Sequence, residues 1–170
     1  IVSPTLEIEG TLTATDRAYV EAARALGLHD FMLSYVEQAE DVEEVRALDP
    51  QARVVLKIES VRGIDLARSA RATLGRLKAA RGDLYVEVLQ PHRVLAALRE
   101  LIQADPEAIA ASRILTSLAF GDVPEEQDIT DVAYLLSLGY RTLMLGDEVC
   151  LRRDSVLAAL NLLEAIAGEV

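Results

Sequence analysis

Short apolar runs alternate with longer amphipathic stretches along most of the chain. Five of these runs are typical of buried parallel strands: residues 30–36, 53–59, 77–84, 113–117 and 141–145. The run at 77–84 is the weakest of the five, because Lys78 and Arg81 interrupt its apolar residues. The pattern therefore predicts a sheet of five short strands.

Helical patterns lie before and between these runs. Apolar residues at three- and four-residue spacing predict helices at 18–26, 41–48, 61–74, 91–103, 128–139 and 154–167. Thr13 and Asp16 have the spacing of a capping box before the first helix, and Gly139 is a typical residue for the end of the fifth. Strands that alternate with helices indicate βαβ units and a parallel sheet, and so the α/β fold class.

Two α/β architectures fit this order. Five β/α units in 170 residues amount to roughly two thirds of a complete (β/α)₈ barrel, which takes about 250 residues. The alternative is a doubly wound sheet of five strands. No glycine-rich nucleotide fingerprint follows any of the five runs, and the Walker pattern is absent from the sequence. The residues alone leave both architectures open.

Charge and cysteine content narrow the classes of function. The 17 basic and 28 acidic residues give a net charge of −11, which argues against a nucleic-acid surface built from clustered Lys and Arg. A small anionic ligand stays compatible with this charge, because a site can be locally positive in an acidic protein. Cys150 is the only cysteine, so an internal disulfide and a cysteine-based zinc site are both excluded.

The apolar content also bears on location. Apolar residues make up 51% of the chain, which is enough to build a sizeable core. No apolar run approaches the roughly 20 residues of a membrane span, and no secretory signal is visible, so we expect a cytoplasmic protein without a membrane partner. Because the first residue is Ile1 rather than Met, we expect either a longer parent chain or a removed N-terminal piece.

Two carboxylates follow neighbouring strands of the predicted sheet. Glu59 ends the run at 53–59, and Asp83 lies in a Gly-Asp turn near the end of the next run. Because the carboxyl ends of parallel strands meet on one face of a barrel, we expect both side chains at one site, where they suit Mg²⁺ or Mn²⁺. Lys57 adds positive charge for an anionic substrate, and backbone N–H groups at Arg81 and Gly82 would bind a substrate carboxylate.

These parts are the ones that an enolate site on a 2-oxo acid needs. The carboxylate and ketone oxygens of such an acid chelate a divalent cation, and a nearby ammonium stabilises the negative charge that develops. A plainer interpretation also fits each residue alone. A charged side chain at a strand end is often a solvated rim position, and Gly82 with Asp83 can be a simple turn.

Five stretches of the chain resemble the catalytic barrel of pyruvate kinases, in the family's order and at about its spacing. KIESVRG at 57–63 resembles the family's KIENQEG, and ARGDLYVEV at 80–88 resembles ARGDLGVEI. The others are LTATDR (12–17), FMLSYVEQAEDV (31–42) and TDVAYLLSLGYRTLMLGDE (130–148), which resemble LTEKDR, FIAASFVRSAEDV and SDVANAVLDGADAVMLSGE. The resemblance implies a TIM-type parallel barrel, present as roughly its last five β/α units. Residues 1–170 would be a single domain without the family's lid or C-terminal effector domain.

The resemblance implies a role for each matching position. Lys57 matches the lysine that neutralises charge on the transferred phosphoryl group and the enolate, and Glu59 and Asp83 match the two metal-binding carboxylates. The turn that receives the substrate carboxylate corresponds to Ala80, Arg81, Gly82 and Asp83. The implied cofactor is Mg²⁺ or Mn²⁺, and the implied ligand is phosphoenolpyruvate, pyruvate or another small 2-oxo acid.

Three further positions match at the edge of the site. Ser112 takes the place of a threonine whose hydroxyl lies near the methylene face of the enolate, which makes Ser112 a candidate for catalysis and substrate binding. Ser34 matches a serine of the monovalent-cation site, and Glu148 matches the glutamate after the last strand. The resemblance thus brings in K⁺, although the family's first barrel strands, which carry further groups of the phosphate and potassium sites, have no counterpart here.

Several positions depart from the family pattern. Tyr85 replaces a glycine beside the expected metal site and would narrow or reshape the pocket. Arg113 replaces a glutamine, and Glu37 stands where arginine is usual. With the missing lid, these changes make a carbon–carbon lyase an alternative to phosphoryl transfer. Such a lyase would be an aldolase or a decarboxylase that uses the same site on a 2-oxo acid.

A non-catalytic barrel kept for assembly or metabolite sensing is a further alternative. The retained Lys57, Glu59 and Asp83 argue against it. Five strands without closure leave unpaired edges, so we expect a homo-oligomer or part of a longer chain.

Overall fold

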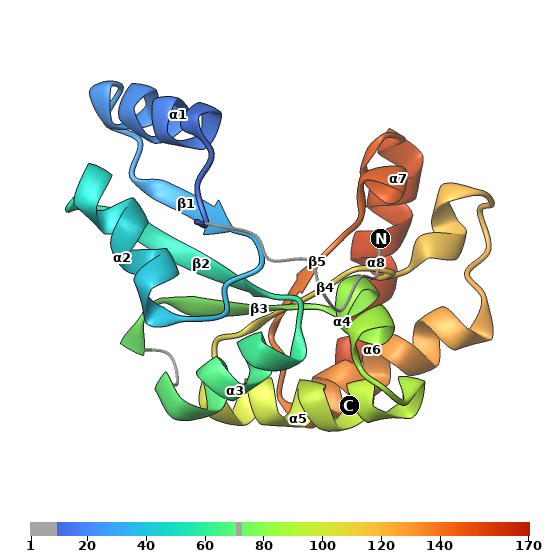
Figure 1. The fold of residues 1–170 in the computed structure, drawn as a ribbon. Helices are drawn as coiled ribbons and strands as arrows, with labels where there is room; N and C mark the ends of the chain where they lie inside the picture. The colour runs from blue at the N-terminus through green and yellow to red at the C-terminus, as the bar shows by residue number, and fades with distance from the viewer. Residues whose placement is uncertain (1–9, 71–72) are drawn as a thin grey trace.

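The protein is described here by a computed structural model that covers residues 10–70 and 73–170. Five parallel strands form one sheet in the order β1-β2-β3-β4-β5 (Figure 1). They are β1 (Asp30–Leu33), β2 (Arg53–Ile58), β3 (Arg76–Ala80), β4 (Ile109–Ala111) and β5 (Thr142–Met144). Each strand pairs in parallel with the next one along the chain, which is the order of successive units in a β/α barrel. The predicted fold class is confirmed.

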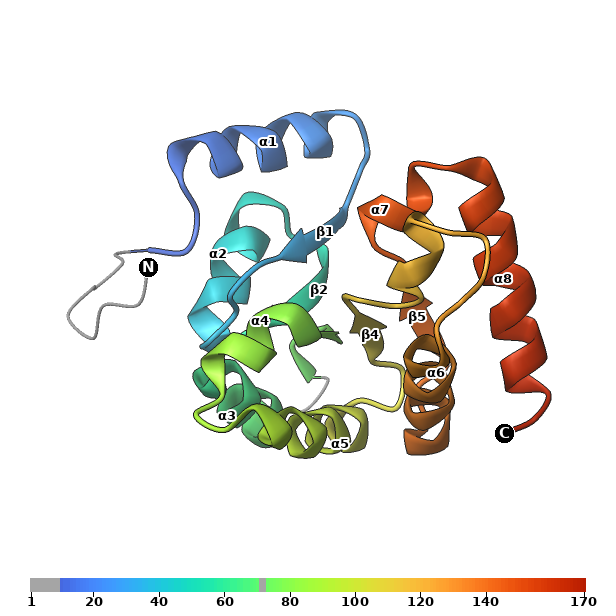
Figure 2. The same cartoon turned by 90° about the vertical axis from the view of Figure 1, so that its right-hand side faces the viewer.

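Helices precede, connect and follow the strands, and the longer helices between the strands lie on one side of the curved sheet (Figures 1 and 2). The helices are α1 (Ala14–Ala25), α2 (Ala39–Leu48), α3 (Val61–Ala70), α4 (Arg81–Glu87), α5 (Val94–Ala104), α6 (Glu126–Leu138), α7 (Asp147–Cys150) and α8 (Arg153–Ala167). Among the described residues, two 3₁₀ turns span Pro91–Arg93 and Thr116–Ala119. None of the helices among the described residues has the length and apolarity needed to cross a bilayer.

The core lies between the sheet and these helices. Alternate residues of β2, namely Val54, Leu56 and Ile58, are buried against the helix layer, while Lys57 points to the opposite face. Leu77 and Ala79 of β3 continue the same buried face. Because side chains alternate along a strand, the polar residues of β2 and β3 gather on the other side of the sheet.

The prediction for β4 was wrong by four residues. The structure places the strand at Ile109–Ala111, whereas residues 113–117 form a loop and the start of a 3₁₀ turn. Ala110 and Ala111 are buried between two neighbouring strands, so small side chains pack well there despite their low strand preference. Ser112, Arg113 and Leu115 instead have positive φ angles of 72°, 56° and 52°, which no strand can accommodate.

Other boundaries also moved. β3 ends at Ala80 rather than at residue 84, because α4 starts at Arg81 and carries Asp83 in its first turn. β1 ends at Leu33 rather than at residue 36. The helix expected at 61–74 ends at Ala70, with residues 71–72 outside the described part, and the one expected at 91–103 begins as a 3₁₀ turn. The Thr13 capping box and the left-handed cap at Gly139 are confirmed.

Candidate active site

The carboxyl ends of the parallel strands meet at one edge of the sheet. Residues that sequence analysis had singled out follow four of these ends: Ser34 after β1, Glu59 after β2, Asp83 after β3 and Ser112 after β4. Lys57 is the second-last residue of β2. The parallel sheet therefore brings these strand ends to one edge, as the sequence predicted. The contacts of each side chain show which of the residues come together.

Lys57, Glu59 and Ser34 form one polar cluster. The Nζ atom of Lys57 lies 2.8 Å from Oε1 of Glu59 and donates a hydrogen bond of 2.8 Å to Oγ of Ser34. The second oxygen of Glu59 accepts a 2.6 Å hydrogen bond from the backbone N–H of Tyr35. The side chain of Glu59 is only 2% exposed, and these partners offset the cost of burying its charge.

Asp83 lies beside this cluster. It occupies the first turn of α4, and none of the described residues makes a hydrogen bond or an ion pair with its carboxylate. Burial, followed by the charges of Asp83, Glu59 and Glu87, raises the pKa of Tyr35 above its ordinary value. Both site carboxylates thus act on the same phenol, which belongs to the residue two positions after the end of β1.

The turn before α4 is joined to the loop after β4. Ala80 is buried and caps α4, and no side chain caps the backbone N–H groups of the first turn. A Cβ atom placed on Gly82 would lie 3.6 Å from both Cβ and Oγ of Ser112. Ser112 therefore packs against the turn that the sequence assigned to the substrate carboxylate, as a shared substrate site requires.

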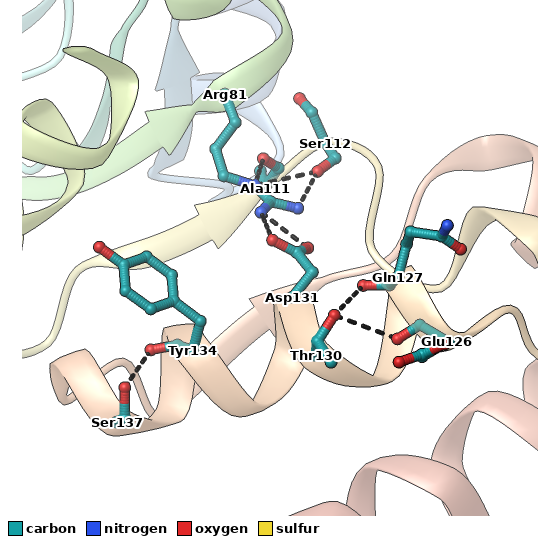
Figure 3. A network of polar contacts seen from close by, with 9 residues as sticks. All are labelled: Arg81, Ala111, Ser112, Glu126, Gln127, Thr130, Asp131, Tyr134 and Ser137. Atoms are coloured by element: carbon teal, nitrogen blue, oxygen red, sulfur yellow. Dashed lines mark hydrogen bonds and ion pairs between the residues drawn. The ribbon is translucent and has the colours of Figure 1, made fainter. Parts of the chain in front are cut away.

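The side chain of Arg81 points away from this turn (Figure 3). Its Nη1 donates to both carboxylate oxygens of Asp131 in α6, at 2.6 and 2.8 Å. Its Nε and Nη2 donate to the carbonyl oxygens of Ala111 and Ser112, at distances between 2.5 and 3.2 Å. Arg81 is thus a clamp between the end of β4 and α6, and only its backbone is left for a substrate.

Glu148 is not brought into the cluster. Its side chain is exposed on the short helix α7 and folds back over Gly146, where one oxygen lies 2.7 Å from the place that a Cβ atom would take. No hydrogen bond or ion pair links it to another residue in the described ranges. The notion that Glu148 belongs to a monovalent-cation site or to the rim of the active site therefore stays a prediction.

Lys78 is a residue that sequence reasoning missed. It stands opposite Lys57 in the pairing of β2 with β3, it is 8% exposed, and its Nζ lies 3.2 Å from Sδ of Met32. Burial and the charge of Lys57 lower the pKa of Lys78 below its ordinary value, while Glu59 and Asp83 act in the opposite direction. The sequence showed it only as an interruption of an apolar run.

The donor set can be tested for its fit to a metal ion. Within residues 10–70 and 73–170, no three His, Cys, Asp or Glu side chains gather closely enough to form a metal cage. Mg²⁺ does not require such a cage, because it usually takes one or two carboxylates and fills its other positions with water and substrate oxygens. Glu59 and the unpartnered carboxylate of Asp83 fit that kind of site.

Comparison with known proteins identifies the family. The family model of the pyruvate kinase barrel domain matches residues 3–151. The chain belongs to the pyruvate kinase family. A pyruvate kinase of Thermoplasma acidophilum is 29% identical over 163 residues, which cover 91% of this chain and 30% of that protein. One from Agrobacterium vitis is 33% identical over 142 residues (81% and 30%), and pyruvate kinase 2 of Saccharomyces cerevisiae is 29% identical over 164 residues (92% and 32%). The chain spans about a third of the length of these relatives.

Two departures from the pyruvate kinase pattern meet in the structure. The guanidinium of Arg113 lies over the ring of Tyr85, 5.5 Å from its centroid, which is a cation–π distance. Tyr85 shares a face of α4 with Arg81, four residues earlier, whereas Asp83 lies on the other face. Both aromatic and guanidinium groups line a cavity of about 270 Å³ between α4, α5 and α6. Ser112 lines the same cavity, so the expectation that Tyr85 narrows or reshapes the pocket stays a prediction.

Proposed function

We propose that this chain carries the catalytic centre of a pyruvate kinase-type enzyme that acts on phosphoenolpyruvate or pyruvate through a metal-stabilised enolate. The observation that carries the proposal is the Lys57–Glu59 ion pair at the end of β2, beside the unpartnered carboxylate of Asp83. Membership of the pyruvate kinase family supports the same centre. Phosphoryl transfer would take place in the complete parent protein.

Glu59 and Asp83 would hold Mg²⁺ or Mn²⁺. When bound, such a cation polarises the ketone oxygen of a 2-oxo acid and stabilises the enolate as a Lewis acid. Lys57 lies 2.8 Å from Glu59, which supports a role in which its ammonium would stabilise the negative charge of the enolate. Ser112 presents a hydroxyl next to the turn at Gly82, close to the place of a bound carboxylate.

The substrate carboxylate would be held by backbone groups. The first turn of α4 offers N–H groups without a side-chain cap, and the Arg81 clamp fixes the neighbouring loop. A K⁺ site at Ser34 and Glu148 stays a prediction. The Ser34 hydroxyl already accepts a hydrogen bond from Lys57.

A carbon–carbon lyase on a 2-oxo acid is the second candidate. It would use the same carboxylates and Lys57 to stabilise the same enolate, without a nucleotide. The buried ammonium of Lys78 on the same face favours this candidate, because it adds a positive charge that would stabilise the enolate without a nucleotide and its metal ions.

The test is oxalate binding measured by calorimetry with and without Mg²⁺. Oxalate resembles the planar enolate of pyruvate. We expect binding that needs Mg²⁺ and that weakens more than about tenfold in Asp83→Asn and Glu59→Gln, since even outer partners of metal ligands are worth 10- to 100-fold. Asp65→Asn, an exposed carboxylate on α3, serves as the matched control and should leave binding unchanged. Absence of binding at millimolar oxalate, or binding indifferent to Mg²⁺ and Asp83, would refute the proposal.

A further inference from the structure

The use of lysine in this chain is unusually selective. Of its 17 basic residues only two are lysines, Lys57 and Lys78, and all the others are arginines. The two lysines stand opposite each other on neighbouring strands, β2 and β3. Because an ammonium is a compact point charge and a guanidinium is a broad planar fork, the two cations are not interchangeable at a confined site. Both places where the chain keeps a lysine lie at the candidate site.

Lys78 lies on the inner face of the sheet, which we define as the side that presents Met32, Lys57 and Lys78. Its neighbours Leu77 and Ala79 point the other way and are fully buried in the core. Among the described residues the Nζ atom of Lys78 makes one hydrogen bond, to the sulfur of Met32 at 3.2 Å, and no carboxylate lies within 4 Å of it. A thioether is a weak acceptor, and a buried ammonium without an anion is costly.

The charges of the four site residues indicate the charge of the ligand that the site would bind. Lys57 and Lys78 together balance Glu59 and Asp83, so the four side chains sum to zero. A divalent cation at the carboxylates leaves two positive charges, which a dianion neutralises. With Lys57 as the only lysine, the same count would leave one positive charge, which matches pyruvate in its keto form. A 2-oxo dicarboxylate is a dianion already in its keto form, whereas pyruvate becomes one only as its enolate. Neighbouring strands are about 4.8 Å apart, so one small ligand on this face can reach both ammonium groups.

We propose that Lys78 binds a second acidic group of the substrate, and that the site takes a 2-oxo dicarboxylate, one carboxylate larger than pyruvate. The inference rests on the proposed function, because the centre at Glu59 and Asp83 holds the 2-oxo end of the same ligand. The second carboxylate then lies over β3 and supplies the anion that Lys78 lacks. This substrate class fits the lyase chemistry of the second candidate when the second carboxylate is on the carbon next to the ketone. Cleavage of its C–C bond then releases CO₂ and leaves the electron pair of that bond on the enolate.

The test compares two stable probes that differ by one carboxylate, malate and lactate, each competing with oxalate in the presence of Mg²⁺. We expect the wild-type protein to bind malate about 10- to 100-fold more tightly than lactate, the range of a hydrogen bond between charged groups. The ratio should fall to about one in Lys78→Met. Methionine matches the length of the lysine stem beside Met32, and removal of an unpaired buried charge should leave the thermal midpoint unchanged or raise it.

Arg76→Met is the matched control. Arg76 belongs to the same strand and the same register series, but its guanidinium is already bound to the carbonyl of Glu107 and the hydroxyl of Thr142. Its removal should leave the malate-to-lactate ratio unchanged. Equal affinities in the wild type, or a preference for malate that survives in Lys78→Met, would overturn the inference.

A second measurement reads Lys78 directly. Reductive methylation with ¹³C-formaldehyde keeps the charge of an amine and labels only two lysines and the N-terminus, so the spectrum is simple. Malate should shift the Lys78 signal, identified by its loss in Lys78→Met, and lactate should not. If oxalate binds with Mg²⁺ and Asp83 but malate leaves that signal in place, the inference fails alone. If oxalate does not bind, the proposed function fails and the inference with it.

Discussion

The Arg81 clamp leads to a quantitative prediction. Its guanidinium joins Asp131 of α6 to two carbonyl oxygens at the end of β4, and the side chain is 11% exposed. In Arg81→Met these acceptors lose a charged donor, and each such hydrogen bond contributes about 1.5–3 kcal/mol, although the contributions are not additive. Breaking a fully buried pair costs about 3–5 kcal/mol, but Asp131 is 35% exposed and water replaces part of the loss. We therefore expect Arg81→Met to lower the free energy of unfolding by about 3 kcal/mol.

Urea denaturation followed by circular dichroism measures this loss. For a chain of this length, each kcal/mol corresponds to about 2–4 °C in the thermal midpoint, so we expect a fall of about 6–12 °C. Arg62→Met is the matched control, because Arg62 pairs with Glu37 at 3.0 Å but is 72% exposed, and such pairs are worth about 1 kcal/mol or less. Equal losses in the two variants, or a loss below about 1 kcal/mol in Arg81→Met, would refute the clamp.

The same variant should also weaken oxalate binding. Ser112 and Arg113 have positive φ angles. A non-glycine residue in that region is strained by about 1–3 kcal/mol, and contacts with the surrounding structure must offset this strain. Arg81 stabilises this backbone conformation by donating a hydrogen bond to the carbonyl of Ser112. A double-mutant cycle with Asp131→Asn should give a coupling energy of about 1–3 kcal/mol. A coupling near zero would mean that the pair acts independently.

Two further predictions concern stability alone. Gly75→Ala should destabilise the fold by more than about 2 kcal/mol in urea, because its Cβ would lie 2.2 Å from the carbonyl oxygen of Val54, whereas Gly121→Ala, with open space around it, should be neutral. Burial acts to raise the pKa of the Asp49 carboxyl. Its hydrogen bonds, one of them from His29, outweigh this effect and hold the pKa below its ordinary value of 3.8. This carboxylate therefore contributes stability above pH 3.8 that is lost as the pH falls through its folded-state pKa, so the difference in unfolding free energy between wild type and Asp49→Asn should shrink below about pH 4. A constant difference between pH 7 and pH 3 would contradict the assignment.

Much of the fold could be predicted because the apolar pattern sets it. Val54, Leu56 and Ile58 alternate along β2 in the way that a half-buried strand requires, and the Thr13 capping box fixes the start of α1 through local hydrogen bonds. β4 could not be found in this way, because its buried alanines have low strand preference. The neighbouring Ile114 and Leu115 are equally buried but belong to a loop whose left-handed residues are not glycines.

The part of the candidate site that depends only on where strands end could be predicted from the sequence. Lys57 and Glu59 meet because they are two residues apart at the end of one strand and point to the same face. The direction of Arg81 depends on where α4 begins and on Asp131, 50 residues later, so no local pattern contains it. Lys78 was missed for a different reason. A lysine inside an apolar run looks like a weak strand until the pairing shows that it faces Lys57.

The sheet edges give the last prediction. In the described part of the chain β1 and β5 each pair on one side only, and Met32 and Met144 on these strands are exposed. Unpaired strand edges recruit other strands, so we expect this chain to self-associate on size-exclusion chromatography with light scattering unless further strands of a longer parent close the sheet. Met144→Lys puts a charge on the β5 edge and should shift the chain toward the monomer with an unchanged circular dichroism spectrum. A well-folded wild-type monomer would contradict the expectation, because it would show that the edges are stable without a partner.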